Sequence, residues 1–369
     1  MPATGCRSAG ALPQTVDEAF VKALPKAELH AHLSGSVSMK TLHGMWSRKR
    51  ASGRCLKLLD PLQAMLSIAE SVDIISFFPL FDQYIYQLLD DIESVQEATR
   101  SVIRDFATDG VKYLELRTTP REHAQTGMTK ASYVHAVHEV IQTHNNSYDV
   151  VCEQSHDIKV YLILSIDRKM TLEQANEVLD LAMTLRTGCV VGIDLSGNPA
   201  RGDVETFTPV FRRAKTEGLH ITVHFAEVLA SATQRELEVI LSWEPDRLGH
   251  VICTSEDVER TIKERRTGLE LCLSCNVLAK MTEGSIADHH FRKWRMTSCP
   301  IALSTDDVGI FQSPLSNEYL LAAQHFELGP QDLVALSKSA ASIAFGDSQS
   351  LRASLKTFET YFQAQGYGC

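Results

Sequence analysis

The sequence predicts an α/β fold of the (β/α)8, or TIM, barrel type, with a helical insertion after the first strand and extra helices at the C-terminus. Short runs rich in Val, Ile, Leu and Tyr alternate with longer segments of helical periodicity, the pattern of a parallel sheet with crossover helices. Eight runs occur, at residues 27–33, 111–117, 159–167, 190–195, 220–225, 247–251, 268–274 and 301–305. No Pro/Gly/Ser-rich linker divides the 369 residues, so one large barrel explains the length better than several domains.

Amphipathic segments follow several of these runs. Residues 172–185, 233–241 and 255–266 place apolar side chains three or four positions apart, as helices that cover a barrel do. Residues 41–104 are too long for one crossover and contain several helical patterns, so we expect a helical insertion that caps the barrel mouth. We further expect a flexible leader over residues 1–23, one barrel domain over residues 24–369, and helices from Glu318 onward that close the outer ring.

Composition limits the partners of this chain. The chain has 36 Lys and Arg residues and 46 Asp and Glu residues. The resulting net charge of -10 argues against binding to nucleic acid or an anionic membrane. No stretch approaches the roughly 18 consecutive apolar residues of a membrane span, and the leader lacks the features of a secretory signal. We therefore expect a cytoplasmic protein with a small-molecule partner and reduced cysteines. A monomer is the expected state, and a dimer stays open.

Polar residues able to do chemistry stand at the C-terminal ends of four predicted strands. Catalytic groups of a TIM barrel come from this edge of the barrel, because the loops there surround one common cavity. Two of the histidines are two positions apart in the first strand and therefore share one face. Any one His-x-His pair can equally be a pair of core or surface histidines, so the argument depends on the whole set. The set is His30 and His32, His224 and Glu227, His250, and Asp306 and Asp307.

Three imidazoles and a carboxylate suit a zinc ion. Zinc takes His nitrogen and carboxylate oxygen ligands and lowers the pKa of a bound water toward about 7, which predicts a hydrolytic site. Four protein ligands exceed the usual three of catalytic zinc, so the site would have to be five-coordinate with its water. A two-metal centre would need a bridging ligand such as a modified lysine, and residues 190–198 contain no lysine. We therefore expect one Zn²⁺ per chain.

Four of these motifs resemble those of the adenosine deaminase family, in order and in spacing, over about residues 24–345. They are Glu-Leu-His-Ala-His-Leu at 28–33, His224 with Glu227, Arg-Leu-Gly-His at 247–250 and Ser-Thr-Asp-Asp at 304–307. Finer motifs are similar to the adenosine deaminase-like branch, whose members hydrolyse the methylamino group from N(6)-methyl-AMP. These finer motifs lie at residues 113–121, 127–130, 193–197 and 288–291.

The resemblance implies a role for each residue of the set. Glu227 would protonate ring nitrogen 1 of a purine, and His250 would orient the attacking water and help to take its proton. Asp307 would position that water and contact ring nitrogen 7, while the Gly197 backbone would meet ring nitrogen 3. The zinc ligands would be His30, His32, His224 and Asp306. The substrate contacts would be His32, Ser34, Thr118, Thr119, Pro120, Arg121, Asp167, Gly197 and Asp307.

The substrate expectation depends on a departure from the parent family. Adenosine deaminases have an acid two residues after the second histidine of the first strand, where it recognises the ribose hydroxyl, and this chain has Ser34 there. A neutral serine does not repel a 5′-phosphate, and Thr118, Thr119 and Arg121 can add hydroxyl donors and a cation. Arg121 can also be an ordinary solvated loop charge. Asp167 is expected to hold ribose hydroxyls.

Two departures from the deaminase-like branch itself bear on nucleotide preference. Its members usually have Asn in place of Ser34, and a His where Tyr86 is the nearest counterpart here. The Cys-x-x-Cys pair at 272–275 is interpreted as packing, since no second pair is present to complete a metal site. His289 and His290 receive no mechanistic role.

The sequence therefore predicts a zinc-dependent hydrolytic deaminase that removes the 6-amino or 6-alkylamino group of a purine nucleotide. The favoured reaction converts N(6)-methyl-AMP to IMP and methylamine. One alternative is adenosine deaminase, which converts adenosine to inosine and ammonia. A second alternative is an inactive barrel that binds nucleosides or a receptor through a structural metal.

Overall fold

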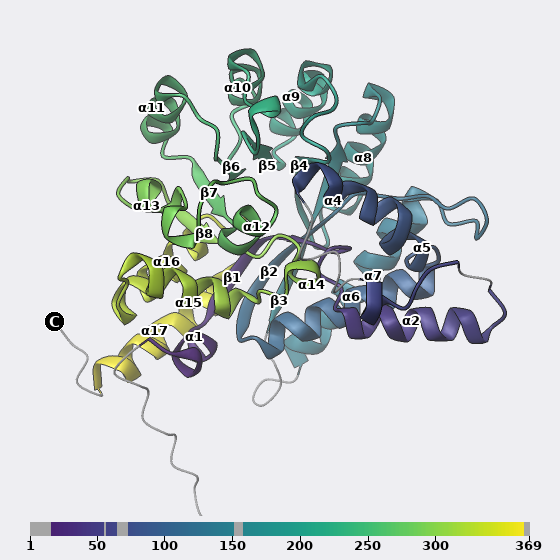
Figure 1. Ribbon diagram of the computed structural model, residues 1–369, viewed down its shortest axis with the longest axis horizontal. Coiled ribbons are helices and arrows are strands. Elements are labelled where there is room, and N and C mark those ends of the chain that lie inside the picture. The colour runs from purple at the N-terminus through teal and green to yellow at the C-terminus, as the bar shows by residue number, and fades with distance from the viewer. Residues whose placement is uncertain (1–15, 55–56, 65–72, 151–157, 365–369) are drawn as a thin grey trace, which may run out of the picture.

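The computed structural model describes residues 16–54, 57–64, 73–150 and 158–364 (Figure 1). Eight strands form one sheet in chain order, and every neighbouring pair is parallel. Ala31 forms a bridge with Asp306, and this bridge joins the first strand to the segment that follows the last one. The predicted TIM barrel is confirmed. Its strands are β1 (Lys26–His32), β2 (Val111–Thr118), β3 (Lys159–Asp167), β4 (Val190–Ser196), β5 (His220–Phe225), β6 (Arg247–His250), β7 (Gly268–Leu271) and β8 (Ile301–Leu303).

The last two strands are shorter than the apolar runs that predicted them. The run at 268–274 continues past β7 into helix α12 (Leu273–Leu278), whose first residues are also buried. Periodicity does not separate a buried strand from a buried helix over so few residues, so the run extends beyond the strand. The run at 301–305 likewise passes β8, and its last residues form the loop that leads to Asp306.

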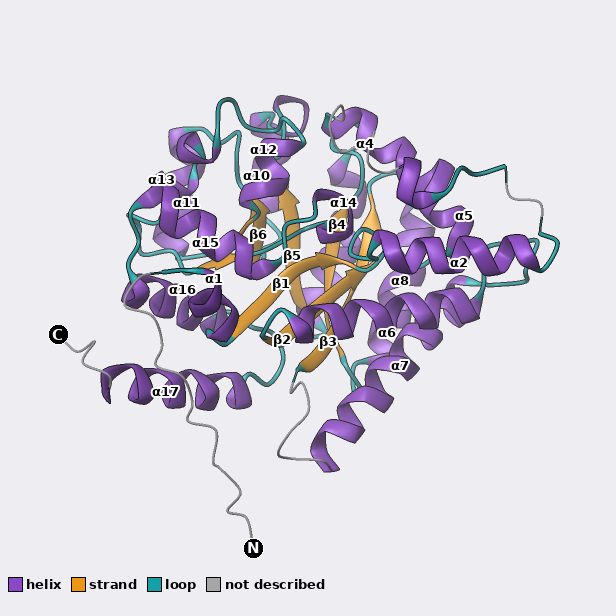
Figure 2. Ribbon diagram, turned by 60° about the horizontal axis from the view of Figure 1, so that its bottom comes forward, coloured by secondary structure: helices purple, strands orange, loops and turns teal. Residues whose placement is uncertain are grey.

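Helices surround the strands on the outside of the barrel, as Figure 2 shows. The three predicted amphipathic helices are confirmed as α8 (Leu172–Leu185), α10 (Gln234–Leu241) and α11 (Glu256–Arg265). Helix α8 begins with a capping box, in which Thr171 and Gln174 satisfy each other's backbone N–H groups. The C-terminal helices also follow the prediction, and α16 packs against β1 and β8. The remaining helices of this part are α7 (Lys130–Val150), α9 (Thr208–Thr216), α13 (Phe291–Trp294), α14 (Val308–Phe311), α15 (Leu315–Phe326), α16 (Pro330–Ser342) and α17 (Gln349–Ala364), with short 3-10 turns at Val204–Phe207, Leu229–Ser231 and Ile286–Asp288.

The insertion after β1 has two parts. One contributes to the cavity at the mouth of the barrel, and the other lies in the outer ring of helices. Helices α4 (Ile74–Leu80) and α5 (Tyr86–Leu88), with the π-helix Phe81–Ile85 between them, supply residues that line the cavity at the C-terminal end of the strands. Helix α6 (Ile92–Thr108) instead packs against α7 and β2 in the outer ring, and α2 (Met39–Ala51) contacts both α5 and α6. Residues 65–72 of the insertion lie outside the described residues.

The start of the chain differs in part from the predicted leader. Residues 1–15 lie outside the described residues, but helix α1 (Glu18–Ala23) lies within the expected leader and buries Phe20 and Val21. The Phe20 ring meets Phe358 of α17 edge to face, with centroids 5.7 Å apart. Apolar spacing over so short a segment is a weak helix signal, and contact with α15 and α17 supplies the packing.

The barrel interior below the mouth is ionic rather than purely apolar. Arg247 Nε lies 2.6 Å from Glu270 Oε1, and Arg117 Nη2 lies 2.7 Å from Glu270 Oε2, with all three side chains fully buried. Arg247 also pairs with Glu115, and Arg117 with Asp194 at 3.4 Å. Buried charges persist only when paired in this way, so the network fixes the relative positions of β2, β4, β6 and β7.

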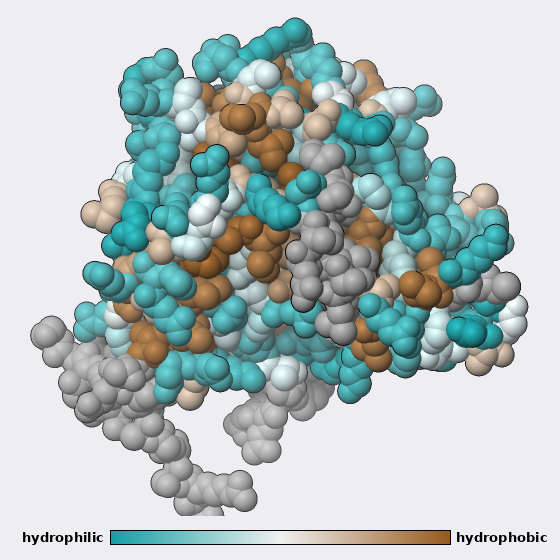
Figure 3. Space-filling model, viewed as in Figure 1, coloured by the Kyte–Doolittle hydropathy of each residue, from teal (hydrophilic) through white to brown (hydrophobic). Residues whose placement is uncertain are grey.

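Two expectations from the sequence concern the cysteines and membrane spans. The five cysteines of the described residues, Cys189, Cys253, Cys272, Cys275 and Cys299, are free. None of the helices in the described part of the chain combines the length and the hydropathy that a membrane crossing needs. Hydrophilic side chains dominate the face that Figure 3 shows, and apolar ones gather in separate patches.

Candidate active site

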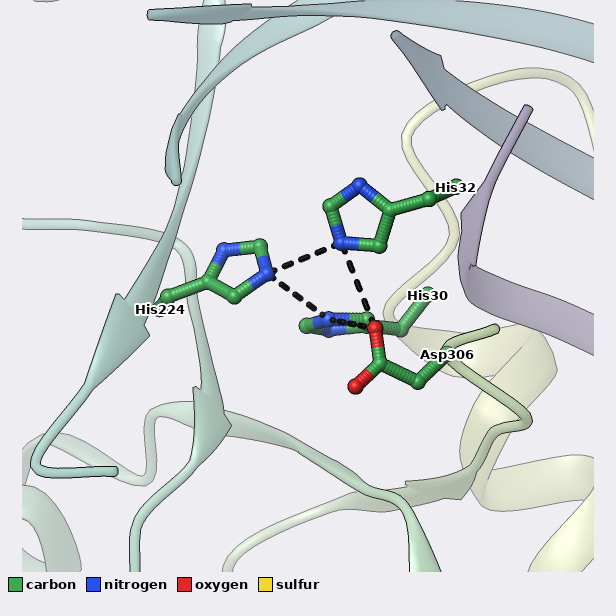
Figure 4. Close-up of side chains that lie close together, drawn as sticks. All are labelled: His30, His32, His224 and Asp306. Carbon is green, nitrogen blue, oxygen red and sulfur yellow. Dashed lines mark hydrogen bonds and ion pairs between the residues drawn. The ribbon is translucent and has the colours of Figure 1, made fainter. Parts of the chain in front are cut away.

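Three histidines and an aspartate meet at the C-terminal end of the barrel (Figure 4). His30 and His32 come from β1, His224 from β5, and Asp306 follows β8. His224 Nε2 lies 3.1 Å from His30 Nε2 and 3.0 Å from His32 Nε2, while Asp306 Oδ1 lies 3.5 and 3.3 Å from the same two nitrogens. The structure therefore brings together the four residues that the resemblance assigned to a metal.

The hydrogen bonds behind the cluster show that its donor atoms fit a cation. His30 Nδ1 lies 2.6 Å from Glu270 Oε2, and His224 Nδ1 lies 3.0 Å from Asp194 Oδ1, so each of these rings, when neutral, carries its proton on Nδ1. The Nε2 lone pairs of His30 and His224 then face each other and repel. Two neutral imidazoles in this tautomer cannot form a hydrogen bond between these atoms, because both are acceptors. A metal ion between them satisfies both lone pairs and the Asp306 carboxylate.

The pKa values of two ligands agree with a positive charge at this point. Burial lowers the pKa of His30, but contacts with Asp306 and Glu270 outweigh burial and raise it to about 9. Burial lowers the pKa of His32 to about 4, so that ring is neutral and its Nε2 is free to coordinate. The neighbouring carboxylates thus favour a positive charge at His30, which a proton or a metal cation can supply, while His32 stays neutral.

Glu227 faces the same cavity from the loop after β5. It is 3% exposed, and within the described residues its Oε1 atom has no hydrogen-bond partner. Burial raises the pKa of Glu227 above its ordinary value. A buried, protonated carboxyl with an unpaired oxygen can donate a proton to a ligand in the cavity.

His250 ends β6 beside the metal cluster. Its Nε2 lies 3.7 Å from Asp306 Oδ2, and its Nδ1 lies 3.2 Å from Asn276 Nδ2. Burial holds the pKa of His250 well below its usual value, so the ring is neutral at physiological pH. When Asn276 donates to Nδ1, the ring proton lies on Nε2, which can then donate to an oxygen bound near Asp306.

Asp307 lies next to Asp306 and points into the same cavity. Burial, together with the neighbouring Asp306 carboxylate, raises the pKa of Asp307 well above its usual value. Gly35 makes room for this side chain, because a Cβ at position 35 would lie 1.5 Å from Asp307 Oδ1. A protonated Asp307 is a hydrogen-bond donor for an acceptor atom of a ligand.

The predicted substrate residues, with one exception, line this cavity. Tyr86 joins them from α5, and the Arg121 guanidinium lies over its ring, 3.1 Å from the centroid. Tyr86 also hydrogen-bonds Ser34, so these three side chains form one cluster. Pro120 is the exception among the predicted contacts. The cavity is lined by His32, Ser34, Ile74, Phe78, Phe81, Tyr86, Arg117, Thr118, Thr119, Arg121, Asp167, Ser196, Gly197, His224, Glu227, His250, Asp306 and Asp307.

Two further predicted contacts depend on local backbone geometry. Gly197 has a φ of +98°, and a Cβ there would lie 2.6 Å from Asp167 Oδ1. Glycine is therefore required for the close approach of these two residues. Thr118 Oγ1 shares a hydrogen bond of 2.6 Å with Tyr133 OH, so its hydroxyl is already partly engaged.

Several residues of the site were missed in the sequence. Glu270 contacts His30, Asp194 contacts His224, Asn276 contacts His250, and the Cys275 thiol donates to Asp306 Oδ2 over 2.9 Å. A charged residue inside an otherwise apolar strand run is the signal that could have revealed Glu270 and Asp194. The interpretation of Cys275 as mere packing misses this contact. His290 contacts the His250 backbone.

Comparisons with known proteins agree with this geometry. The profile described as "Adenosine deaminase" matches residues 25–360. The N6-mAMP deaminase of Arabidopsis thaliana is 36% identical over 89% of this chain and 95% of its own length, and the human N6-Methyl-AMP deaminase is 35% identical over 91% and 93%. The crystal structure of Arabidopsis N6-mAMP deaminase matches with a TM-score of 0.83, 36% identity and coverage of 93% of this chain and 99% of that chain.

A solved ADAL-IMP complex matches with a TM-score of 0.83 and 35% identity, covering 95% of this chain and 100% of that chain. The predicted resemblance to the adenosine deaminase family is confirmed over nearly the whole chain. The chain belongs to the adenosine deaminase family.

Proposed function

We propose that this chain is a zinc-dependent hydrolytic deaminase that converts N(6)-methyl-AMP to IMP and methylamine. The observation that carries the proposal is the single cavity in which a four-donor metal cluster, two buried carboxyls and a cationic aromatic cluster meet. Relatives named N6-methyl-AMP deaminase support the substrate, and a neighbour solved with IMP supports the product.

One Zn²⁺ would be held by His30, His32, His224 and Asp306. When bound, zinc supplies a Lewis acid that brings the pKa of water toward about 7 and so provides a nucleophile at neutral pH. Glu270 and Asp194 keep the two ligand rings they contact in the tautomer that coordinates.

Glu227, His250 and Asp307 act on the purine and the attacking water. Glu227 donates its proton to ring nitrogen 1, which makes C6 electron-poor, and Asp307 donates a hydrogen bond to ring nitrogen 7. His250 orients the water, whose oxygen bonds to C6. The C6–N6 bond then breaks, one of the two protons of the water returns to the Glu227 carboxylate, and methylamine leaves with the other. His250 can accept that proton only if Asn276 presents its oxygen to Nδ1 instead of its nitrogen.

The cluster of Ser34, Tyr86 and Arg121 would bind the 5′-phosphate. Arg121 supplies a cation and the two hydroxyls supply hydrogen bonds, while neutral Ser34 places no carboxylate where the phosphate would lie. Thr119 lines the same end of the cavity, Asp167 would hold ribose hydroxyls, and the Gly197 backbone would meet ring nitrogen 3.

A side-by-side turnover assay tests the proposal. Purified protein with a measured zinc content is incubated with N(6)-methyl-AMP, AMP and adenosine, and the products are separated chromatographically. We expect conversion of N(6)-methyl-AMP to IMP, little action on adenosine and one zinc per chain. Preference for adenosine would overturn the phosphate assignment, and no turnover of any purine by zinc-loaded protein would favour the inactive barrel.

A further inference from the structure

The backbone at the end of β6 has an unusual conformation. His250 and Val251 are consecutive non-glycine residues with φ of +65° and +56°. A side chain disfavours this left-handed region, and a β-branched residue such as valine disfavours it most. Such a turn persists only when the surrounding structure holds it, and it is found preferentially at functional sites.

The carbonyl groups of this turn are held by side chains from one short segment. His290 Nε2 lies 2.6 Å from the His250 oxygen, and Trp294 Nε1 lies 3.4 Å from the Val251 oxygen. The first contact is short and the second is long for an N–H···O bond, so His290 makes the stronger contact. His290 directly precedes helix α13, and Trp294 is the last residue of that helix.

His290 is itself built into position. Its ring stacks on His289 with centroids 4.0 Å apart, and His289 Nδ1 accepts a hydrogen bond of 3.0 Å from the backbone N–H of Phe291. Phe291 and Trp294 are fully buried, so the segment is anchored in the core. Burial lowers the pKa of His290 to about 4, and the neutral ring presents its single proton on Nε2 to the carbonyl.

The position of the His250 ring depends on this turn. The chain leaves β6 through a left-handed residue, and in this conformation the His250 Nε2 lies 3.7 Å from Asp306 Oδ2. Without a donor at position 290 the His250 carbonyl loses its side-chain partner, and the turn can relax toward an ordinary conformation. The imidazole would then shift relative to the metal cluster and the substrate.

We propose that His290 is a positioning residue for catalysis, which fixes the left-handed turn of His250 through its carbonyl and so holds the His250 imidazole against the reacting water. This inference rests on the proposed role of His250. It gives a function to a histidine that is neither one of the four residues of the metal cluster nor one of those that line the cavity.

Three variants and one control test the inference. His290→Leu removes the donor, His290→Gln keeps an N–H donor on a side chain of similar reach, and His290→Asn keeps the donor on a side chain too short to reach. His144→Leu is the matched control, because His144 Nε2 also donates to a backbone carbonyl, that of Ile158 at 2.9 Å, far from the mouth of the barrel. Turnover is measured on whichever purine the parent enzyme converts.

We expect His290→Leu to lower kcat by about 10- to 100-fold with KM changed less than about threefold and full zinc content, since small misplacements of a reacting group have effects of that size. His290→Gln should recover most of the loss, and His144→Leu should keep the parent kcat. If His290→Leu does not fold, a higher kcat for His290→Gln than for His290→Asn supports the inference. Equal kcat values for these two, or a kcat for His290→Leu within about twofold of the parent, would overturn it.

A double-mutant comparison separates this inference from the proposed function. If His290 acts through His250, His290→Leu should have little further effect in a His250→Ala background. An equal loss in both backgrounds would overturn the positioning role and leave a merely structural one. If instead His250→Ala alone keeps the parent kcat, the proposed role of His250 fails, and the positioning inference fails with it.

Discussion

Replacing Glu227 by Gln removes one proton donor from the cavity and leaves its size unchanged. Glu227 is 3% exposed, and its Oε1 atom has no hydrogen-bond partner among the described residues. A positioned general acid typically contributes about 10²- to 10⁴-fold to the rate. We therefore expect Glu227→Gln to lower kcat by about that factor. Zinc content should not change, because Glu227 is outside the four-donor cluster.

The pH dependence gives a second readout for the same variant. Burial raises the pKa of Glu227, so the protonated, working form persists above the pH at which an ordinary glutamate ionises. Turnover by the parent enzyme should fall as pH rises through this raised pKa, and Glu227→Gln should lack that alkaline limb. The assay is kcat and KM against pH on N(6)-methyl-AMP, with zinc measured by elemental analysis.

The exposed Glu244 supplies the control, since Glu244→Gln makes the same chemical change away from the cavity and should leave kcat unchanged. Glu227 would not be the general acid if Glu227→Gln, with full zinc, kept more than about a tenth of the parent kcat. A loss of activity that followed a loss of zinc would equally refute it, because it would place Glu227 in the metal site.

Three other predictions concern the metal, the phosphate and the fit of Asp307. Glu270→Gln should weaken zinc binding by about 10- to 100-fold in a chelator competition, because Glu270 orients the ligand His30. Unchanged affinity would contradict that role. Arg121→Gln should raise KM for N(6)-methyl-AMP about tenfold or more with little change in kcat, as expected for a lost charge-assisted contact. An unchanged KM in steady-state assays would mean that Arg121 does not bind the phosphate and is an ordinary solvated loop charge. Gly35→Ala should lower kcat about 100-fold, because the added Cβ would lie 1.5 Å from Asp307 Oδ1 and would displace that side chain. Kinetic constants equal to those of the parent would show that catalysis does not depend on this position of the Asp307 side chain.

Much of the fold and of the metal cluster could be predicted because both follow from local pattern. Apolar runs of strand length, separated by amphipathic segments, gave eight strands in the right places. Since parallel strands bring their C-terminal ends to one edge, His30, His224 and Asp306 had to lie near one another once the barrel was assumed. The resemblance then assigned roles to residues that the topology had already placed together.

The parts that could not be predicted depend on contacts between distant residues. Glu270 meets His30 across 240 positions of sequence, and its partner Arg247 lies on another strand again. A lone charge in an apolar run shows that a partner exists, but it does not show which one. The contact between His290 and the His250 carbonyl is harder still, because a backbone acceptor leaves no trace in residue identity.

The conformation of the strand ends explains how neighbouring residues can share one cavity. Side chains alternate along a strand, so Asp306 and Asp307 would point to opposite faces if β8 simply continued. Asp306 has a φ of +61°, and the turn lets both carboxyls line the cavity. Ala226, with a φ of +53°, does the same between His224 and Glu227 after β5. Because none of these residues is glycine, the sequence carries no sign of the turns, which lie at or beside the residues on which the proposed chemistry depends.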